Sequence, residues 1–483
     1  MSQKHNVIII GAGLSGIIAA RRLREHGVAS IILEARDRVG GRVHSVPLGN
    51  GQLIDLGTSM IIGQEGNPLV PFVEATPGVR LVERDGELLI PRPGAQPLSA
   101  EDSGNIMDVV WEAYDEAAEQ SREESDSVSD HASVAEFVDQ YLDHAAKERK
   151  LDRDLLRCGS DMLTEDFGAE LDDLSLKHIG TVEEYEGEDG LLLGGHSTVL
   201  RHAATKAVLD SVLLQHVVTS VDYTGDSVHV ATANHGSFLA DAVLITVPLG
   251  VLKANAIQFN PPLSAARQQA VRRTGFGNLN MVILEYTHLA KPFWPMTGEF
   301  STIRPAEVET DHALAADILP RPSVYFANYQ DIIGYPALAA YLPCALAEYI
   351  EKYTDEQVAD LFARHLKRYF PAAPDTQPTR CLVSRWVNDP FSRGSYSYVA
   401  VGGDRKDFDI LATPCQATRS AHDVQSSDAI PPPVKAGTAH QPVLFWAGEH
   451  TETNRHSYAH GALLSGERAA GQLLSFLGVE THA

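Results

Sequence analysis

Apolar runs of strand length alternate with a stretch of helical character at the beginning of the chain. Residues 6–10 form a short, fully apolar run rich in β-branched side chains, and residues 29–34 form a second apolar run. Between them lie a glycine cluster and residues 14–24, which read as a helix. Strand, tight turn, helix and strand in this order predict a βαβ unit, so we expect a parallel sheet to open the fold.

The hydrophobic pattern predicts further elements along the rest of the chain. We expect helices at residues 151–163, 345–369 and 458–477, and strands at residues 213–223, 227–231, 242–246, 280–286 and 443–446. Residues 101–130 are acidic and contain several serines, which predicts solvated helix and loop. Residues 414–441 are polar and contain three consecutive prolines, which predicts a long surface loop.

Composition places the chain among ordinary globular proteins, with 44% hydrophobic and 21% charged residues. A length of 483 residues favours two domains over one small core. The chain has 39 basic and 64 acidic residues, which give a formal charge of −25. This charge would repel phosphate backbones and argues against nucleic acid as a partner. Such a surface would attract protonated amines, although an excess of acidic residues also commonly serves to keep a protein soluble.

The four cysteines, Cys158, Cys344, Cys381 and Cys415, are widely spaced and form no C-x-x-C pair. This spacing argues against a zinc site and a disulfide framework, and it favours a reducing compartment. The first residues lead directly into a strand, without the charged leader and apolar core of a signal peptide. No apolar run approaches the ~20 residues that cross a bilayer. We therefore expect a cytoplasmic protein without a bound metal or a membrane partner.

The glycine cluster carries the first chemical signal. Gly11, Gly13 and Gly16 fit the pattern G-x-G-x-x-G between a predicted strand and a predicted helix. The first glycine permits a tight turn, the second lets the backbone approach a pyrophosphate, and the third lets helix and strand pack closely. The helix N-terminus offers N–H groups and partial positive charge to the phosphates. Glu34 ends the next strand, where an acidic side chain accepts a hydrogen bond from a ribose hydroxyl.

The residues after Glu34 distinguish between the dinucleotides that use this motif. Ala35, Arg36, Gly41 and Arg42 belong to the run E-A-R-D-R-V-G-G-R. This run resembles the extension typical of flavin-containing amine oxidases, in which paired glycines and an arginine let a loop fold against phosphate and flavin. The resemblance implies that FAD is the cofactor.

Further segments along nearly the whole chain resemble the same family. They are residues 55–57, 66–69, 194–197, 246–252, 393–398, 447–451 and 460–466. By resemblance, the backbone of Val218 meets the adenine, and Gly448 and Glu449 lie near the ribityl chain. The N-terminus of the last helix, around Ala459, would point N–H groups at the anionic part of reduced flavin.

The sequences of two segments, residues 174–178 and 275–280, most resemble those of lysine-specific histone demethylases and polyamine oxidases. The demethylases carry a long helical insertion and an extra N-terminal domain for which this chain has no room, so a free-standing oxidase of small amines is the better interpretation. The implied fold class is α/β, with a Rossmann-type FAD-binding domain and an α+β substrate-binding domain. We expect residues 1–75, 190–255 and 435–483 in the former, and residues 76–189 and 256–434 in the latter.

The family reaction moves a hydride from the carbon next to the amine to flavin N5, and the resulting imine is hydrolysed. Tyr396 and Tyr458 match the positions of two aromatic rings that align the amine in front of the flavin, where a cation–ring contact contributes ~0.5–2 kcal/mol. Trp386 resembles a wall beside the flavin. Each of the three could instead be an ordinary core aromatic with a satisfied polar atom.

Two further positions bear on the substrate and the cofactor. Asp166 precedes an aromatic residue where plant polyamine oxidases carry an acid, so it is a candidate to bind a distal ammonium, although a surface acid is the simpler interpretation. Ser395 stands where monoamine oxidases have the cysteine that bonds to FAD. Because serine cannot form that thioether, the FAD is expected to be non-covalent.

Met281 is a departure from the family, which has lysine at this position. That lysine holds a water near flavin N5 and assists the reaction of reduced flavin with O2, whereas methionine has neither a donor nor a charge. Residue 281 is therefore a candidate catalytic position with three interpretations. Methionine is native and oxygen use is slow or another electron acceptor is used; methionine is native and other groups activate oxygen; or methionine is an engineered substitution.

Three alternative functions remain open at this point. One is a flavin desaturase or dehydrogenase acting on a non-amine, and the aromatic pair argues against it. A second is an L-amino acid oxidase, which usually has a carboxylate-binding arginine in the segment that here reads G-T-S-M-I, residues 57–61. A third is a catalytically impaired flavin-binding protein, which only Met281 supports.

Overall fold

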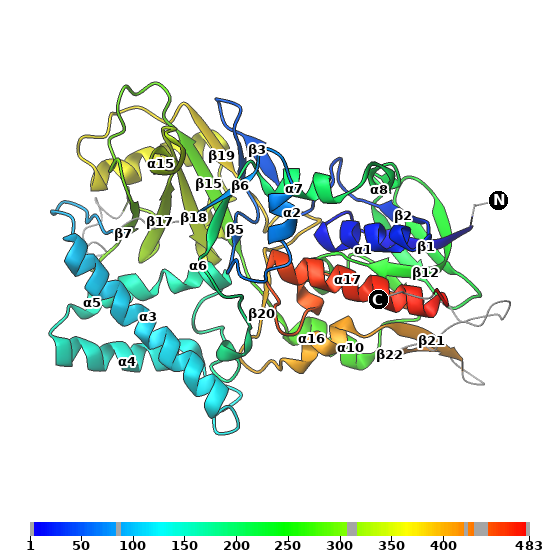
Figure 1. The fold of residues 1–483 in the computed structure, drawn as a ribbon. Coiled ribbons are helices and arrows are strands. Elements are labelled where there is room, and N and C mark those ends of the chain that lie inside the picture. The colour runs from blue at the N-terminus through cyan, green and yellow to red at the C-terminus, as the bar shows by residue number, and fades with distance from the viewer. Residues whose placement is uncertain (1–3, 84–87, 307–315, 420–423, 429–442, 480–483) are drawn as a thin grey trace.

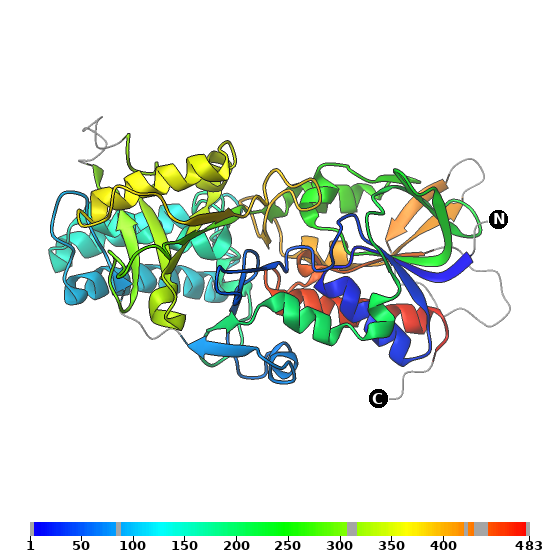
Figure 2. The same ribbon diagram turned by 90° about the horizontal axis from the view of Figure 1, so that it is seen from above.

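The protein is elongated, with two lobes that meet along a central seam (Figure 1, Figure 2). The computed structural model describes residues 4–83, 88–306, 316–419, 424–428 and 443–479. Both described ends of the chain lie in the same lobe (Figure 1). The chain therefore leaves this lobe and returns to it, as a fold assembled from separated segments requires.

The predicted βαβ unit is present at the start of this lobe. Strand β1 (Lys4–Ile10) is followed by helix α1 (Leu14–Glu25) and strand β2 (Ser30–Leu33). Strands β1 and β2 are parallel, with Val7 paired to Ser30. Residues Val7 to Ile10 are at most 3% exposed, because helices or strands cover both faces of the strand, and this burial explains their continuous apolar character.

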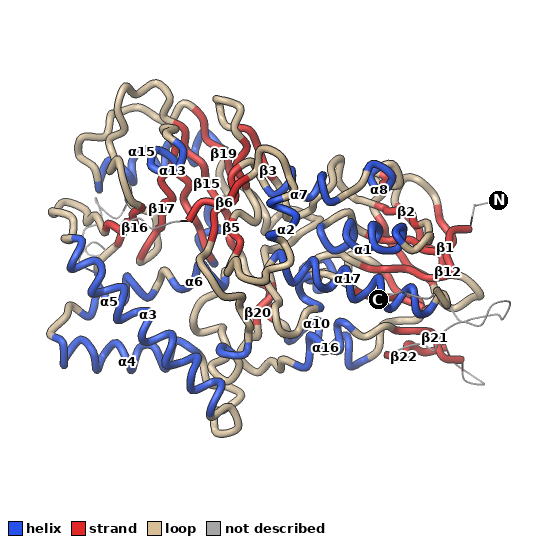
Figure 3. Tube along the Cα trace, in the orientation of Figure 1, coloured by secondary structure: helices blue, strands red, loops and turns tan. Residues whose placement is uncertain are grey.

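This unit belongs to a ten-stranded sheet. Its parallel centre runs in the order β9 (Val212–Leu213), β2, β1 and β12 (Ser237–Ile245), and β23 (Val443–Trp446) pairs in parallel with the second half of β12. Strands β10 (Val218–Asp222), β11 (Val228–Thr232) and β13 (Gln258–Asn260) extend the sheet on the other side of β12. Helix α17 (Ala459–Phe476) packs beside α1 on one face (Figure 1, Figure 3).

The other lobe is built on a six-stranded sheet in the order β19 (Arg380–Val383), β15 (Leu279–Glu285), β18 (Ala337–Pro343), β17 (Ser323–Asn328), β16 (Glu299–Ile303) and β7 (Leu88–Leu89). One face, with Val282 and Leu284, packs against helix α15 (Asp355–Tyr369). The opposite face, with Met281 and Ile283, turns toward the centre of the molecule. Helices α3 (Ala100–Glu123), α4 (Val134–Arg149), α5 (Arg153–Ser160) and α6 (Leu163–Phe167) form a separate layer.

The remaining described elements are mostly short. They are β3 (Ser45–Pro47), β4 (Leu53–Asp55), β5 (Met60–Ile61), α2 (Val70–Glu74), β6 (Arg80–Glu83), η1 (Ile179–Thr181), β8 (Gly190–Leu193), α7 (His196–Ala203), α8 (Lys206–Leu209), α9 (Leu249–Lys253), α10 (Ala265–Arg273), β14 (Gly275–Phe276), α13 (Tyr329–Ile333), α14 (Cys344–Ile350), β20 (Ser397–Tyr398), α16 (Lys406–Ala412), β21 (Cys415–Arg419), β22 (Val424–Asp428) and η2 (Glu449–Thr451).

Two predicted helices are interrupted. Residues 345–369 form α14 and α15 instead of one helix, because Thr354 begins α15 with a capping box that includes Gln357. Residues 151–163 form α5, which ends at Ser160, and the start of α6. The predicted strand at residues 213–223 is likewise divided between β9 and β10, with Gln215 between them at a φ of 60°.

The predicted loop at residues 414–441 was wrong in its first half. Residues 415–419 and 424–428 form an antiparallel pair, β21 and β22, and β21 pairs in turn with β23. Buried Arg267 ties this pair to the lobe, because its guanidinium bonds Asp428 and the carbonyls of Leu411 and Thr413. The three prolines at 431–433 lie outside the described residues.

The strands that join the ten-stranded sheet suggest different domain boundaries from those predicted from the sequence. Strands β13, β21 and β22 belong to the ten-stranded sheet, although residues 256–434 were assigned to the substrate-binding part. Helix α10 also contacts α16, which packs beside η2. We therefore propose that residues 256–273, 404–419 and 424–428 belong with the dinucleotide-binding part.

Within the described segments, no helix is long and apolar enough to cross a membrane. The same part of the chain holds no group of three or more side chains suited to bind a metal ion. All four cysteines are free.

Candidate cofactor and substrate site

A cavity of about 1150 Å³ lies between the lobes. It exceeds the roughly 300–1,000 Å³ of a pocket for one drug-sized ligand. Its lining runs from Glu34 and Val218 in the ten-stranded sheet to Met281 and Tyr341 in the six-stranded sheet. The cavity therefore has room for an extended cofactor at one end and a smaller molecule at the other.

The glycine motif forms one wall of this cavity. Gly11 and Gly13 line it, whereas Gly16 lies behind them. A Cβ on Gly16 would lie 2.2 Å from the carbonyl oxygen of Gly11, so this glycine is required for the packing of helix on strand. A Cβ on Gly13 would meet no protein atom closer than 4.0 Å, so protein packing does not require glycine there. The close approach of a ligand phosphate does, and this cradle fits FAD.

The N-terminus of α1 faces the same cavity, because Gly13, Leu14 and Ser15 all line it. Gly13 occupies the N-cap position, no side chain caps the helix, and its first turn has no acidic residue. Its N–H groups and the positive end of its dipole are therefore suited to bind an anion, as the motif predicts.

Glu34, Ala35 and Arg36 line the cavity at the end of β2. The Glu34 carboxylate accepts hydrogen bonds from the backbone N–H groups of Ala12, at 2.7 Å, and Arg36, at 2.8 Å. Each carboxylate oxygen keeps a second acceptor site, so a ribose hydroxyl fits beside these bonds. The Arg36 guanidinium pairs with Asp389 at 2.5 Å, and its buried Nη2 has no protein partner.

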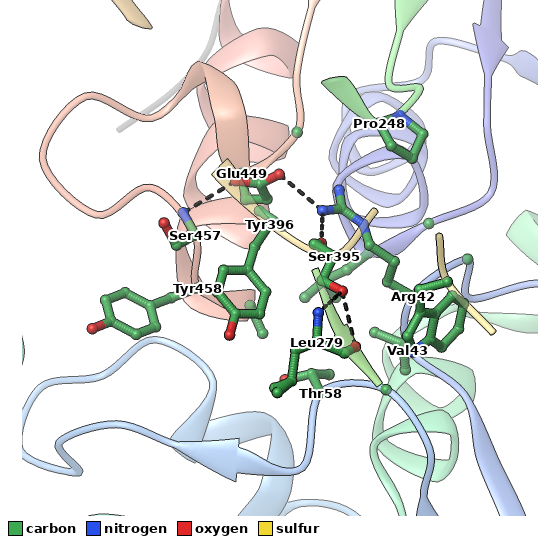
Figure 4. A pocket seen from close by; sticks show the side chains of 18 of the residues that line it. Arg42, Val43, Thr58, Pro248, Leu279, Ser395, Tyr396, Glu449, Ser457 and Tyr458 are labelled. Carbon is green, nitrogen blue, oxygen red and sulfur yellow. Dashed lines mark hydrogen bonds and ion pairs between the residues drawn. The ribbon is translucent and has the colours of Figure 1, made fainter. Parts of the chain in front are cut away.

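Arg42 and Glu449 connect three segments of the chain around the cavity (Figure 4). Arg42 Nη1 donates to Glu449 at 2.9 Å and to the carbonyl oxygen of Ser395 at 2.5 Å. The other oxygen of Glu449 accepts hydrogen bonds from the Ser397 hydroxyl, at 2.5 Å, and the Ser457 N–H, at 3.1 Å. Glu449 therefore organises the loops that surround the cofactor end, and Arg42 and Gly41 line the cavity beside it.

The charge state of Glu449 gives a prediction for pH. Burial alone would raise its pKa, but Arg42, with contributions from His450 and Ser397, lowers the pKa from 4.5 to about 2. A carboxyl whose pKa is lower in the folded state stabilises the fold above its unfolded pKa. We expect this contribution, about 3 kcal/mol, to disappear as the pH falls from about 5 to about 2.

The measurement is the urea unfolding free energy of the wild type and Glu449→Gln across this pH range. The difference between the two proteins is expected to be largest near neutrality and to shrink on acidification. A difference that is independent of pH would contradict the assigned charge of Glu449.

Val218 lines the same end of the cavity as Glu34, together with His216 and Val217, at the start of β10. Near the centre, Gly448 and Ala459 line it as well. Gly448 has a φ of 131°, and a Cβ there would lie 2.7 Å from the His450 ring. Ala459 is the first residue of α17, whose N-terminus has neither a side-chain cap nor an acidic residue in its first turn. A second helix N-terminus therefore meets the cavity.

Tyr396 and Tyr458 line the same part of the cavity, with their hydroxyls pointing in different directions (Figure 4). The Tyr396 hydroxyl donates to the carbonyl oxygen of Glu165 at 2.6 Å, and the Tyr458 hydroxyl donates to the Glu184 carboxylate at 2.7 Å. Burial, with nearby carboxylates, raises the pKa of both tyrosines well above the ordinary value. Both rings therefore stay neutral and can contact a cation.

Trp386 and Met281 line the cavity from the six-stranded side. Trp386 is 6% exposed, and its indole N–H donates to the carbonyl oxygen of Leu56 at 3.0 Å. Met281 is 4% exposed and pairs across the sheet with Tyr341, which also lines the cavity. The structure brings the departure from the family pattern into the cavity.

Ser395 also lines the cavity, and its hydroxyl group both accepts and donates a hydrogen bond. Its Oγ accepts from the Leu279 N–H at 2.8 Å and donates to the Leu279 carbonyl oxygen at 3.0 Å (Figure 4). Its role in this structure is to join two strand ends.

Asp166, at the end of α6, lines the cavity near Tyr396. Several residues that the sequence did not single out lie in the same region: Trp111, Tyr114, Asp115 and Glu184. Trp111 is 44% exposed and meets the Tyr114 ring edge-on at 6.1 Å. Aromatic rings and carboxylates thus share this outer wall, which is a combination that favours cations.

A smaller cavity of about 290 Å³ adjoins the first. The two share the residues of one wall, which are Tyr114, Asp115, Asp166, Phe167, Glu184, Ser457 and Tyr458. Tyr458 and Glu184 therefore stand at a partition between two spaces.

Comparisons with known proteins agree with this geometry. The family model for flavin-containing amine oxidoreductases matches residues 14–474. The chain is 30% identical to a probable polyamine oxidase 4 of Arabidopsis thaliana, over 97% of this chain and 88% of that protein. It is also 30% identical to a lysine-specific histone demethylase 1 homolog of Oryza sativa subsp. japonica, over 97% of this chain but 57% of that protein.

Among solved structures, a putrescine oxidase double mutant redesigned in cofactor binding has a TM-score of 0.70 at 19% identity, covering 98% of this chain and all of the other. This likeness confirms the two-domain fold. The chain belongs to the flavin-containing amine oxidoreductase family. It is an amine oxidoreductase with FAD as its cofactor, and the glycine cradle and two helix N-termini are the parts of this structure that fit the cofactor.

Proposed function

We propose that the protein oxidises a small amine that carries more than one ammonium group, such as a diamine or polyamine. The observation that carries this proposal is the outer wall of the cavity, where Trp111, Tyr114 and Tyr458 lie together with Asp115 and Glu184. A monoamine needs only the aromatic rings, whereas these carboxylates provide an attraction for a second positive charge. The polyamine oxidase among the relatives supports this choice.

FAD, when bound, supplies the N5 atom that accepts a hydride from the carbon next to the nitrogen, giving an imine that water hydrolyses to an aldehyde, with O2 reduced to H2O2. The residues of the chain bind the cofactor and orient the amine. Tyr396 and Tyr458 restrict the amine by shape and ring electrostatics, and Trp386 limits the space beside them. Because Ser395 cannot form a thioether, we propose that FAD is held without a covalent bond.

The alternatives have less support. A desaturase for an apolar substrate would gain nothing from Asp115 and Glu184 at the cavity wall. An L-amino acid oxidase needs a cation for the substrate carboxylate, and the cavity segment of residues 57–61, where related enzymes supply arginine, reads G-T-S-M-I. For the demethylases, the 57% coverage of the relative leaves a large part of that protein without a counterpart in this chain.

The proposal predicts a preference between matched substrates. We expect kcat/KM for a four-carbon diamine to exceed that for a four-carbon monoamine by at least about tenfold, which corresponds to ~1.4 kcal/mol. The measurement is the formation of H2O2 and aldehyde with butylamine, putrescine, spermidine and an L-amino acid. Equal rates for monoamine and diamine, or a preference for the amino acid, would contradict the proposed substrate class.

A further inference from the structure

The Tyr458 side chain has a polar partner at its hydroxyl and a ring neighbour beside it. It occupies the N-cap position of α17, so its backbone is held by the helix start, and Ser457 before it has a φ of 74°. Its side chain meets the His460 ring at a centroid distance of 4.9 Å. Its hydroxyl donates to Glu184 at 2.7 Å, across 274 residues of sequence. The Glu184 carboxylate is therefore the hydrogen-bond partner that holds the polar end of this ring.

Glu184 belongs to an acidic loop, residues 182–189, that is itself tied to the surrounding structure. The Glu183 N–H donates to the carbonyl oxygen of Asn454 at 2.8 Å, and Arg455 pairs with the Glu183 carboxylate at 3.1 Å. Arg455 also lies over the Tyr185 ring, 4.5 Å from its centroid. These contacts join the loop to the segment that leads into α17.

The other side of the loop is fixed as well. The Glu65 N–H donates to the carbonyl oxygen of Glu186 at 2.7 Å, and the Gly63 N–H donates to the Asp189 carboxylate at 2.8 Å. The Tyr185 ring meets the His460 ring edge-on at 5.1 Å. The loop that carries Glu184 is thus held on both sides, and the Glu184 carboxylate accepts the hydrogen bond of the Tyr458 hydroxyl.

We propose that Glu184 is a positioning residue for amine oxidation, which holds the Tyr458 ring as the partition between the two cavities and thereby fixes the aromatic wall that orients the amine. This inference rests on the proposed function of the cavity. In the oxidation step Glu184 acts through the Tyr458 hydroxyl, whereas the attraction of its charge for a distal ammonium acts on the binding of the amine.

Side-chain chemistry separates these two roles. Glutamine keeps an oxygen acceptor for the Tyr458 hydroxyl but removes the charge, whereas alanine removes both. A positioning role predicts that, at saturating amine, Glu184→Gln changes the limiting rate of anaerobic flavin reduction by less than about threefold, whereas Glu184→Ala lowers this limiting rate about tenfold. The loss of charge in Glu184→Gln is expected to appear in the amine concentration needed for half-saturation. The matched control is Glu188→Ala, which removes a carboxylate of the same loop that does not line the cavity, and we expect it to leave the rate unchanged.

A double-mutant cycle with Tyr458→Phe provides the decisive comparison. If Glu184 acts through the hydroxyl, Glu184→Ala changes the rate by less than about twofold once the hydroxyl is gone. An undiminished tenfold loss in the Tyr458→Phe background, or equal losses for Glu184→Gln and Glu184→Ala, would overturn the inference. The visible flavin band of each variant shows that FAD remains bound and that the fold is intact.

The crystal structure of the Glu184→Ala holoenzyme is an independent measurement that needs no turnover. We expect the Tyr458 ring to change its orientation or to occupy two orientations, and to stay in place in Glu184→Gln. An unchanged Tyr458 ring in Glu184→Ala would contradict the positioning role. Failure of the proposed function is distinct from both outcomes, because it would show in the wild type as a flavin that no amine reduces.

Discussion

Replacing Gly13 with valine is expected to give a folded protein that purifies without FAD and without amine oxidase activity. A Cβ at this position meets no protein atom closer than 4.0 Å, and its φ of −72° is one that valine adopts easily. The added side chain stands where the backbone must approach the pyrophosphate. We expect FAD affinity to fall at least about 100-fold, roughly 3 kcal/mol, as measured by flavin fluorescence titration of the apoprotein.

Two other glycines serve as controls for this experiment. Gly471→Ala adds a methyl group to exposed helix surface, where a Cβ meets nothing within 4 Å, and should retain FAD. Gly16→Ala places a Cβ 2.2 Å from a carbonyl oxygen and should reduce folding stability itself. A Gly13→Val protein that retains flavin at full occupancy would show that the pyrophosphate does not lie on this turn.

Replacing Met281 with lysine is expected to accelerate the reaction of the reduced enzyme with O2 about 10- to 100-fold. The side chain lines the cavity from β15, and methionine offers neither charge nor hydrogen-bond donor there. A positioned donor near developing negative charge is typically worth a factor of about 10²–10³ in rate. The measurement is stopped-flow reoxidation of the enzyme after anaerobic reduction by an amine.

The matched control at this position is Met281→Leu, which preserves volume and apolar character and should reoxidise at the wild-type rate. Amine-driven flavin reduction should change by less than about threefold in Met281→Lys, since the amine contacts the aromatic wall. Reoxidation in Met281→Lys at the wild-type rate would show that residue 281 has no part in the oxygen reaction.

Local motifs made the cofactor end of the cavity predictable from the sequence. Gly11, Gly13 and Glu34 lie within one βαβ unit, so a short pattern specifies their geometry. The later segments around Ser395 and Glu449 were found by family resemblance, and the structure brings them to the same cavity. Their hydrogen bonds to Arg42 could not be predicted, because no local pattern joins residues more than 350 positions apart.

The outer wall of the cavity was largely missed for the same reason. Trp111 and Tyr114 lie three positions apart in an acidic helix, where no motif distinguishes them from ordinary packing residues. Glu184 lies in a polar loop without periodicity, and only the tertiary fold places it against Tyr458. Asp166 was found by resemblance alone. It lines the cavity, and its role in binding the substrate stays a prediction.

The errors in secondary structure have identifiable physical causes. The break before α15 had a signal in the sequence, because Thr354 and Gln357 fit the capping-box pattern. The pairing of β21 and β22 had no such signal. Their residues are largely polar, and their pairing depends on β23 and on Arg267, which lie elsewhere in the sequence.

The measurement that tests the central claim most directly is anaerobic titration of the purified yellow protein with diamines and polyamines while the visible flavin band is recorded. The account predicts that at least one of these amines bleaches the band, that the colour returns slowly in air, and that denaturation releases FAD into solution. A flavin that no amine bleaches would contradict amine oxidation in this cavity, and a protein without flavin would contradict the assignment of the cofactor.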